Sequence, residues 1–227
     1  MQTLFTCLKK ISVTAVLATS LAAGVPAISQ ATPMLRYTIA STSGVGTLLG
    51  PGMVSAGTGT ISGVTYSFTG TSKPALGSAE KPVLDLFSLS LKNAGSVTTA
   101  DVWLTDTGFS GHTTPLGLLS SYGGTLTSLT GSGTAQFWSY ADSSNAAWGV
   151  DTPLQDSGLI SSVGFFGGDL YSSHTLTSPF SLTLHARFKL GTGTSITSAD
   201  QSISVPEPGV LGMVGLGLLM VGLMGLR

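Results

Sequence analysis

The stretch FSLTLHARFKL, residues 180–190, decides the fold. Apolar side chains occupy every second position of these eleven residues, and polar side chains occupy the positions between them. A period of two predicts a β-strand with one buried and one solvent-facing side. The solvent-facing side would carry Ser181, Thr183, His185, Arg187 and Lys189. We expect the imidazole of His185 to be solvated there.

Shorter segments repeat this alternation. Val64–Phe68 and Leu35–Ile39 both place an apolar side chain at every second residue. In Leu84–Leu91 the alternation changes phase, and a β-bulge near Leu86–Phe87 would reconcile its two halves. Further predicted strands are Ser96–Leu104, Thr134–Tyr140 and Ser161–Phe166.

Glycine-rich segments separate these strands and are typical of turns, where a positive φ is tolerated. The predicted turns are Gly123-Gly124, Gly131–Gly133, Gly167-Gly168 and Gly191–Gly193. Between residues 32 and 204, no segment keeps the 3.6-residue apolar period of an amphipathic helix. The predicted fold class is therefore all-β, an antiparallel β-sandwich or jelly roll of about eight to ten strands.

The composition of residues 32–205 suits one domain with an uncharged polar surface. Six basic and nine acidic side chains give a net charge of −3, which excludes the concentrated basic face of a nucleic-acid-binding protein. Thr, Ser and Gly number 26, 29 and 24 among these 174 residues, while apolar residues recur throughout. Such a chain can bury a core under a surface covered by hydroxyl groups.

The N-terminus has the order of a secretory signal peptide. Lys9 and Lys10 precede an apolar stretch that runs to about residue 23, and small residues follow. We predict export by the Sec machinery and cleavage by signal peptidase after Ala31, with Ala27 as the alternative. Cys7, the one cysteine of the chain, precedes the apolar stretch, so a lipid anchor is not expected and the mature chain would lack disulfides.

The C-terminus carries a second signal. The motif Val205-Pro206-Glu207-Pro208 is followed by Gly209–Leu226, 18 residues without a charge, and then by Arg227. The uncharged run has the length of a short transmembrane helix, and Arg227 would anchor its cytoplasmic end. A buried C-terminal helix would carry a polar stripe, and this run has none.

This ending resembles the PEP-CTERM sorting signal of Gram-negative bacterial surface proteins. The resemblance implies an exosortase as partner, transient anchoring in the inner membrane, and then release or transfer to the cell surface. The family usually ends in several basic residues, whereas this chain ends in Arg227 alone. Thr105–Phe109 and Pro179–Leu184 also resemble segments of PEP-CTERM passenger domains. The predicted division is a signal peptide at 1–31, a β-sandwich at 32–204 and a sorting signal at 205–227.

The sequence does not predict an enzyme. Glu80 is the one glutamate between the two signals, so a pair of glutamates for glycoside hydrolysis cannot form within the chain. A Ser/His/Asp triad has no support, because none of the three histidines, His112, His174 and His185, lies in a recognisable catalytic motif.

Two kinds of binding site are considered. The oxygen-rich segments Asp142–Asn145 and Asp151–Asp156 could hold Ca²⁺, although such clusters usually form turns, and no metal or cofactor is assigned. Aromatic side chains could stack on sugars: Trp103, Trp138, Tyr140 and Trp148. We expect Trp138 to lie in the core, and Trp148, in a loop, to be the better candidate for a sugar contact.

The sequence thus predicts an exported surface or extracellular-matrix protein with a structural or adhesive role among exopolysaccharides, as in a biofilm. The alternative is a lectin-like carbohydrate-binding module, with or without Ca²⁺.

Overall fold

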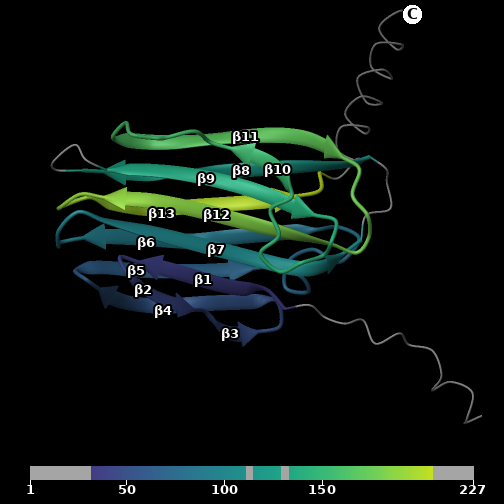
Figure 1. Ribbon diagram of the computed structural model, residues 1–227, viewed down its shortest axis with the longest axis horizontal. Helices are drawn as coiled ribbons and strands as arrows, with labels where there is room; N and C mark the ends of the chain where they lie inside the picture. The colour runs from purple at the N-terminus through teal and green to yellow at the C-terminus, as the bar shows by residue number, and fades with distance from the viewer. Residues whose placement is uncertain (1–31, 111–114, 129–132, 207–227) are drawn as a thin grey trace, which may run out of the picture.

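The computed structural model describes residues 32–110, 115–128 and 133–206 (Figure 1). The predicted cleavage site at Ala31, the motif residues Glu207 and Pro208, and the membrane helix with Arg227 lie outside these residues. The first motif residue, Val205, follows the last strand directly, and its N–H donates to the carbonyl of Pro82 at 3.1 Å. Within the described part of the chain, no helix is long and apolar enough to span a membrane.

Thirteen strands among the described residues form two antiparallel sheets. Sheet A has six strands in the order β10 (Thr152–Asp156), β9 (Thr134–Asp142), β12 (Phe180–Leu190), β7 (Thr98–Phe109), β1 (Met34–Ile39) and β2 (Thr42–Val45). Sheet B has seven, in the order β11 (Gly164–His174), β8 (Leu116–Thr127), β13 (Ser195–Ser204), β6 (Val83–Asn93), β5 (Val64–Thr71), β4 (Met53–Ile61) and β3 (Thr47–Gly50). The prediction of an all-β antiparallel sandwich is confirmed.

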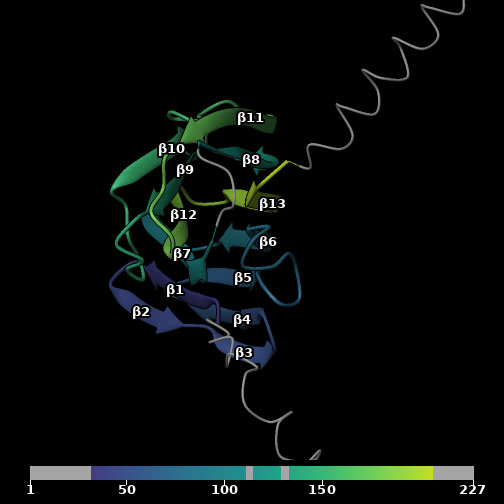
Figure 2. The ribbon, with the colours of Figure 1, turned by 90° about the vertical axis from the view of Figure 1, so that its right-hand side faces the viewer.

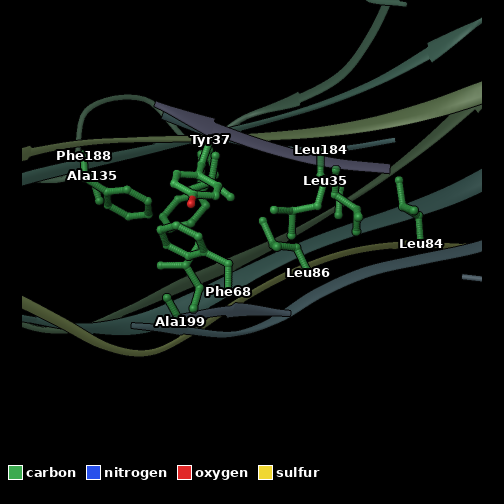
Figure 3. Packing of buried hydrophobic residues seen from close by; sticks show 14 of the residues in the cluster. Leu35, Tyr37, Phe68, Leu84, Leu86, Ala135, Leu184, Phe188 and Ala199 are labelled. Atoms are coloured by element: carbon green, nitrogen blue, oxygen red, sulfur yellow. The ribbon is translucent and has the colours of Figure 1, made fainter. Parts of the chain in front are cut away.

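The core lies between the two sheets, which face each other as two layers (Figure 2). The inward side chains of β12 pack with those of β6 and β13, as the period of two requires. At one end, the rings of Tyr37, Tyr66 and Phe68 pack together, and the two tyrosine hydroxyls share a hydrogen bond of 2.9 Å (Figure 3). This bond joins β1 of sheet A to β5 of sheet B through the core.

The alternating segments form the predicted strands. β12 has the predicted bounds, and β1 and β5 contain Leu35–Ile39 and Val64–Phe68. The bulge in β6 is also confirmed: Ser88 has a φ of 55°, and the pairing with β5 and β13 shifts there. The bulge turns Phe87 outward and keeps the leucines before and after it in the core.

Three expectations about the strands and turns are wrong. The described residues hold thirteen strands rather than eight to ten, because β2, β3, β4 and β10 are short or rich in Ser, Thr and Gly and show little apolar alternation. Gly123-Gly124 and Gly167-Gly168 are not turns but lie inside β8 and β11, where Gly123 faces Gly167. A Cβ on Gly124 would lie 2.8 Å from the ring of Phe166, so close packing requires this glycine.

Other boundaries shift less. The predicted strand at 161–166 begins at Gly164 and continues to His174, which therefore ends a strand rather than lying in a turn. Gly191–Gly193 is the turn between β12 and β13, as predicted, and Gly193 has a φ of 75°.

Candidate functional site

A row of stacked side chains crosses the outer face of sheet A. The pairing register places Trp138 of β9, His185 of β12, Trp103 of β7 and Arg36 of β1 side by side on four neighbouring strands. The His185 ring stacks on Trp103 at 3.6 Å between centroids and on Trp138 at 4.7 Å, with interplanar angles of 8° and 16°. We call these four residues the aromatic row. Stacking on both faces buries His185 to 5% exposure.

Asp101 lies beside the row and bonds to both His185 and Arg187. Its Oδ1 lies 2.8 Å from His185 Nε2 and 2.8 Å from Arg187 Nε. Burial raises the pKa of Asp101, but the hydrogen bonds from His185 and Arg187 outweigh it and hold this pKa below its usual value. Burial lowers the pKa of His185, and the attraction of Asp101 only partly offsets this effect. At neutral pH His185 is therefore an uncharged donor to an ionised Asp101.

A groove of about 640 Å³ opens between this face and the edge strand β2. Arg36, Asp101, Trp103 and Arg187 line one side, and the other includes Ser43, Gly44 and Val45. A Cβ on Gly44 would lie 2.3 Å from the Tyr37 ring. Only glycine therefore fits at this point of β2, which packs against that ring. The groove thus combines one indole with charged and hydroxyl groups.

The loop between β9 and β10 covers one end of the aromatic row. Trp148 lies in this loop with a φ of 66°, and the Arg36 guanidinium lies 4.3 Å from its ring centroid and 4.9 Å from that of Trp103. The Trp148 N–H donates to Thr105 Oγ1 at 3.3 Å, and the Gly108 N–H donates to Asn145 Oδ1 at 2.7 Å. The end of β7 therefore holds the loop that places Trp148 on Arg36.

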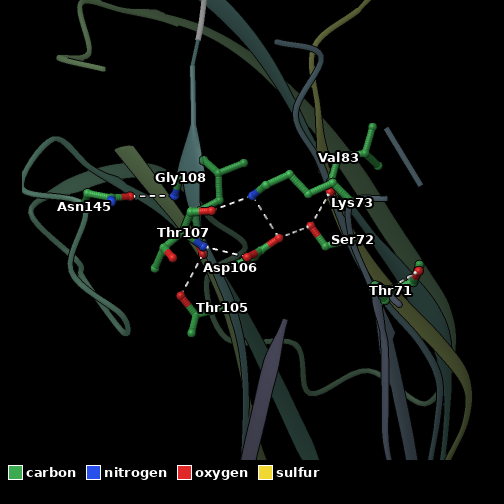
Figure 4. A network of polar contacts seen from close by, with 11 residues as sticks. Thr71, Ser72, Lys73, Val83, Thr105, Asp106, Thr107, Gly108 and Asn145 are labelled. Carbon is green, nitrogen blue, oxygen red and sulfur yellow. Dashed lines mark hydrogen bonds and ion pairs between the residues drawn. The ribbon is translucent and has the colours of Figure 1, made fainter. Parts of the chain in front are cut away.

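The same end of β7 is fixed from the core side by a buried ion pair (Figure 4). Asp106 is fully buried and accepts hydrogen bonds from Ser72 Oγ at 2.7 Å, from the Thr107 N–H at 2.7 Å and from Lys73 Nζ at 3.2 Å. Lys73 also donates to the Thr107 carbonyl, and its ammonium lies 3.8 Å from the Phe109 ring centroid. The Thr105–Phe109 segment thus links sheet B, the core and the Trp148 loop.

The sugar-binding candidates all lie on one face of sheet A, but not as predicted. Trp138 was expected in the core; it is half-buried on the outer face, because β9 directs Phe137 and Ser139 inward. His185 was expected to be solvated; it lies on the predicted face but is buried by the two indoles. Tyr140 also points outward from β9. Trp148 contacts Arg36 rather than lining the groove, and its sugar contact stays a prediction.

Of the oxygen-rich segments, Asp142–Asn145 forms a turn, whereas most of Asp151–Asp156 is strand β10. Asp142 is buried, and its Oδ1 accepts the Ser144 N–H at 2.6 Å. Asp156 accepts the Gly158 N–H at 2.8 Å. Within the part of the chain that the structure describes, no cluster of three His, Cys, Asp or Glu side chains could hold a metal ion.

Sequence reasoning missed Arg36 and Asp101 and treated Arg187 as part of a solvated face. Their outward phase could be inferred from the alternation in β1, β7 and β12. No local signal shows that these three strands are neighbours, because their pairing joins residues 61 to 92 positions apart in the chain.

No protein-family model and no curated protein matches the chain. Among solved structures, the chain is similar to TmCBM27, a carbohydrate-binding module whose structure accompanies a study of specific mannan recognition. The TM-score is 0.31 with 10% sequence identity, and the match covers 74% of this chain and 98% of that one. A similarity of this extent identifies no ligand or site in the present chain.

Proposed function

We propose that this chain is an exported envelope or extracellular-matrix protein that binds polysaccharide, without catalysis, in the groove beside Trp103. The observation that supports the proposal is the groove itself, where a rigidly stacked indole adjoins the Asp101–Arg187 ion pair. Its volume falls within the range of about 300–1,000 Å³ that is usual for ligand sites.

The chemistry of the groove suits a sugar. Asp101 can accept and Arg187 can donate hydrogen bonds to neighbouring sugar hydroxyls, and the exposed part of the indole can contact the apolar C–H surface of a ring. The side chains of Thr38 and Ser43 add hydroxyl groups on the edge side. This single arranged site favours the lectin-like alternative over a matrix protein without a discrete ligand.

A glycan array followed by affinity electrophoresis with soluble polysaccharides tests the proposal. We expect the wild-type protein to be retarded by at least one polysaccharide and Trp103→Leu to bind it about tenfold or more weakly, because stacking groups each contribute about 1 kcal/mol or more. Tyr171→Leu is the matched control, since Tyr171 is 61% exposed on β11, at the edge of the other sheet. Far-UV circular dichroism checks that each variant is folded.

Two outcomes would overturn the groove assignment: no retardation by any polysaccharide, or equal retardation of the wild type and Trp103→Leu. The array is run with and without a chelator. Binding that disappears with chelator would favour the Ca²⁺-dependent form of the alternative.

We also propose that the two terminal signals deliver the domain, with Val205–Pro208 recognised by an exosortase after Sec-dependent export. The sequence motif, the uncharged run and the terminal Arg227 support this proposal. Mass spectrometry of the protein from hosts with and without an exosortase would locate both mature ends. We expect cleavage after Ala31 in both hosts. The uncharged run should be lost only in the host that has an exosortase. A protein that retains Arg227 in both hosts would contradict the proposal.

A further inference from the structure

The guanidinium of Arg36 is held rigidly at the groove. It extends from β1 and lies over two indoles, 4.9 Å from the Trp103 centroid and 4.3 Å from the Trp148 centroid. A cation over an aromatic face is attracted by the ring, and more strongly where water is excluded. The two rings therefore fix the direction of a side chain that would otherwise be flexible.

Arg36 has no acidic partner among the described residues. The nearby carboxylate, Asp101, is already shared by His185 and Arg187. No side-chain hydrogen bond or ion pair of Arg36 to another described residue is formed, so its five N–H donors are available to a ligand. A guanidinium that is half-buried, oriented and without a counter-charge is prepared to receive an anion.

The charges around the groove leave one positive charge for that anion. Arg187 and Asp101 neutralise each other, and burial lowers the pKa of His185 so that the imidazole is uncharged near neutral pH. The domain as a whole carries a net charge of −3, so a polyanion would not be attracted without a specific contact. Selectivity for an acidic ligand would therefore depend on Arg36.

We propose that the groove selects acidic polysaccharides and that Arg36 binds the carboxylate of a hexuronate residue. This inference rests on the proposed polysaccharide binding and names its ligand class. A carboxylate matches the planar guanidinium through two parallel N–H···O bonds, which a neutral hydroxymethyl group cannot form. Trp103 and Trp148 act as positioning residues for the guanidinium, and Asp101 remains the acceptor for sugar hydroxyls.

The test compares polymers that differ only in the acid group. Polygalacturonate, polyglucuronate and alginate are each titrated by calorimetry against the full-length protein beside the same polymer after carboxyl reduction. We expect at least one polyuronate to bind about tenfold or more tightly than its reduced form, since a charge-assisted hydrogen bond is stronger than one between neutral groups. A sulfated polysaccharide without carboxylates is included, and equal binding of this polymer would contradict the assignment to a carboxylate.

The substitution Arg36→Gln should remove the preference for each polyuronate over its carboxyl-reduced form. Lys189→Gln is the matched control, because Lys189 is exposed on the same face but does not line the groove. An equal loss in both variants would indicate general electrostatic attraction instead of a site. Arg36→Lys should recover only part of the preference, since an ammonium cannot form the paired bonds.

The outcomes separate the two proposals. Equal binding of each acidic polymer and its reduced form by the wild type would overturn the acidic selectivity and leave polysaccharide binding intact. Absence of binding to every polymer would overturn both. The wild-type comparison requires no variant, so it decides the question even if Arg36→Gln were to unfold.

Discussion

At the scale of single residues, the Lys73–Asp106 ion pair places two opposite charges in the interior of the sandwich. Asp106 is fully buried yet receives three hydrogen bonds and faces Lys73, so its charge is compensated inside the core. Burial raises the pKa of Asp106 and lowers that of Lys73, and their mutual attraction opposes both changes. A protein with a buried ion pair loses most stability when one partner alone is removed, because the other charge then stays buried without compensation.

Asp106→Asn should therefore lower the free energy of unfolding by about 3–5 kcal/mol, because it leaves the Lys73 ammonium buried without a counter-charge. Guanidinium unfolding measures the change. The double variant Lys73→Met/Asp106→Leu should regain most of the loss, and Glu80→Gln, at an exposed position, should cost less than about 0.5 kcal/mol. A loss below about 1 kcal/mol for Asp106→Asn would show that the pair is not needed for stability.

Asp85 is a carboxyl group that lacks such compensation. Burial, and then repulsion by Asp200 on the neighbouring strand β13, raises the pKa of Asp85 to about 6. The unfolded chain would titrate near pH 4, so between about pH 4 and 6 the folded state binds more protons. Stability linked to Asp85 is present below pH 4 and is lost as the pH rises through 6.

We therefore expect Asp85→Asn to raise the melting temperature at pH 7 by about 2–4 °C, roughly 1 kcal/mol once solvent screening is allowed for. The gain should fall as the pH is lowered through 6 and should be small at pH 4, where Asp85 is protonated in the folded state and about half protonated in the unfolded chain. Thermal melts from pH 4 to 8 measure it, with Asp169→Asn on exposed β11 as control. A gain that is the same at pH 4 and pH 7 would contradict the titration of Asp85.

At the scale of elements, the loop between β9 and β10 connects the fold to the site. It is held by Thr105, Gly108 and Ser181, whose hydroxyl donates to the Ala146 carbonyl at 2.7 Å. Gly149 follows Trp148 directly, and a Cβ at this position would lie 1.9 Å from Asp142 Oδ2. Because Asp142 is buried and bonded to Ser144, the loop would have to move.

Gly149→Ala should thus displace Trp148 from Arg36 and weaken polyuronate binding, with a loss of stability of about 1–3 kcal/mol. Calorimetric titration and tryptophan fluorescence report the two effects. Gly50→Ala is the control, since a Cβ there meets no atom within 4 Å. Unchanged binding in Gly149→Ala would show that Trp148 is not required to position Arg36.

At the scale of the whole molecule, the sheets are joined by polar contacts through or beside the core. The Tyr37–Tyr66 hydrogen bond links β1 to β5, and the Lys73–Asp106 pair links β7 to the segment after β5. All three tryptophans lie on the outer side of sheet A or in its covering loop. Tryptophan fluorescence therefore reports on sheet A, whereas far-UV circular dichroism reports on both sheets.

We expect guanidinium unfolding curves from these two probes to coincide, because each sheet buries its apolar face only against the other. A fluorescence transition at lower denaturant concentration would instead mean that sheet A opens before sheet B. The same two curves are recorded for Asp106→Asn. Because this variant weakens the link between the sheets, it should be more prone to show two separate transitions.

How much of this structure can be predicted from the sequence depends on whether the interactions involved are local or join distant parts of the chain. The face to which a side chain points follows from the local pleat, so FSLTLHARFKL placed His185 and Arg187 outward without knowledge of any other strand. The glycines inside β8 and β11 were misassigned as turns, because the sequence does not show that Phe166 packs on Gly124. Trp138 was wrongly predicted to lie in the core, because the side chains that half-bury it on the outer face come from other strands.

The sequence by itself determined the β class, the phase of the main strands, the bulge in β6 and the expectation of export. Only the tertiary structure decided which strands are neighbours, and therefore that Arg36, Trp103, His185 and Trp138 form one row. The physical reason is that strand phase is set by successive residues, whereas strand order is set by packing two sheets around a shared core. The burial of His185 and the position of the Arg36 guanidinium over Trp103 are consequences of that order.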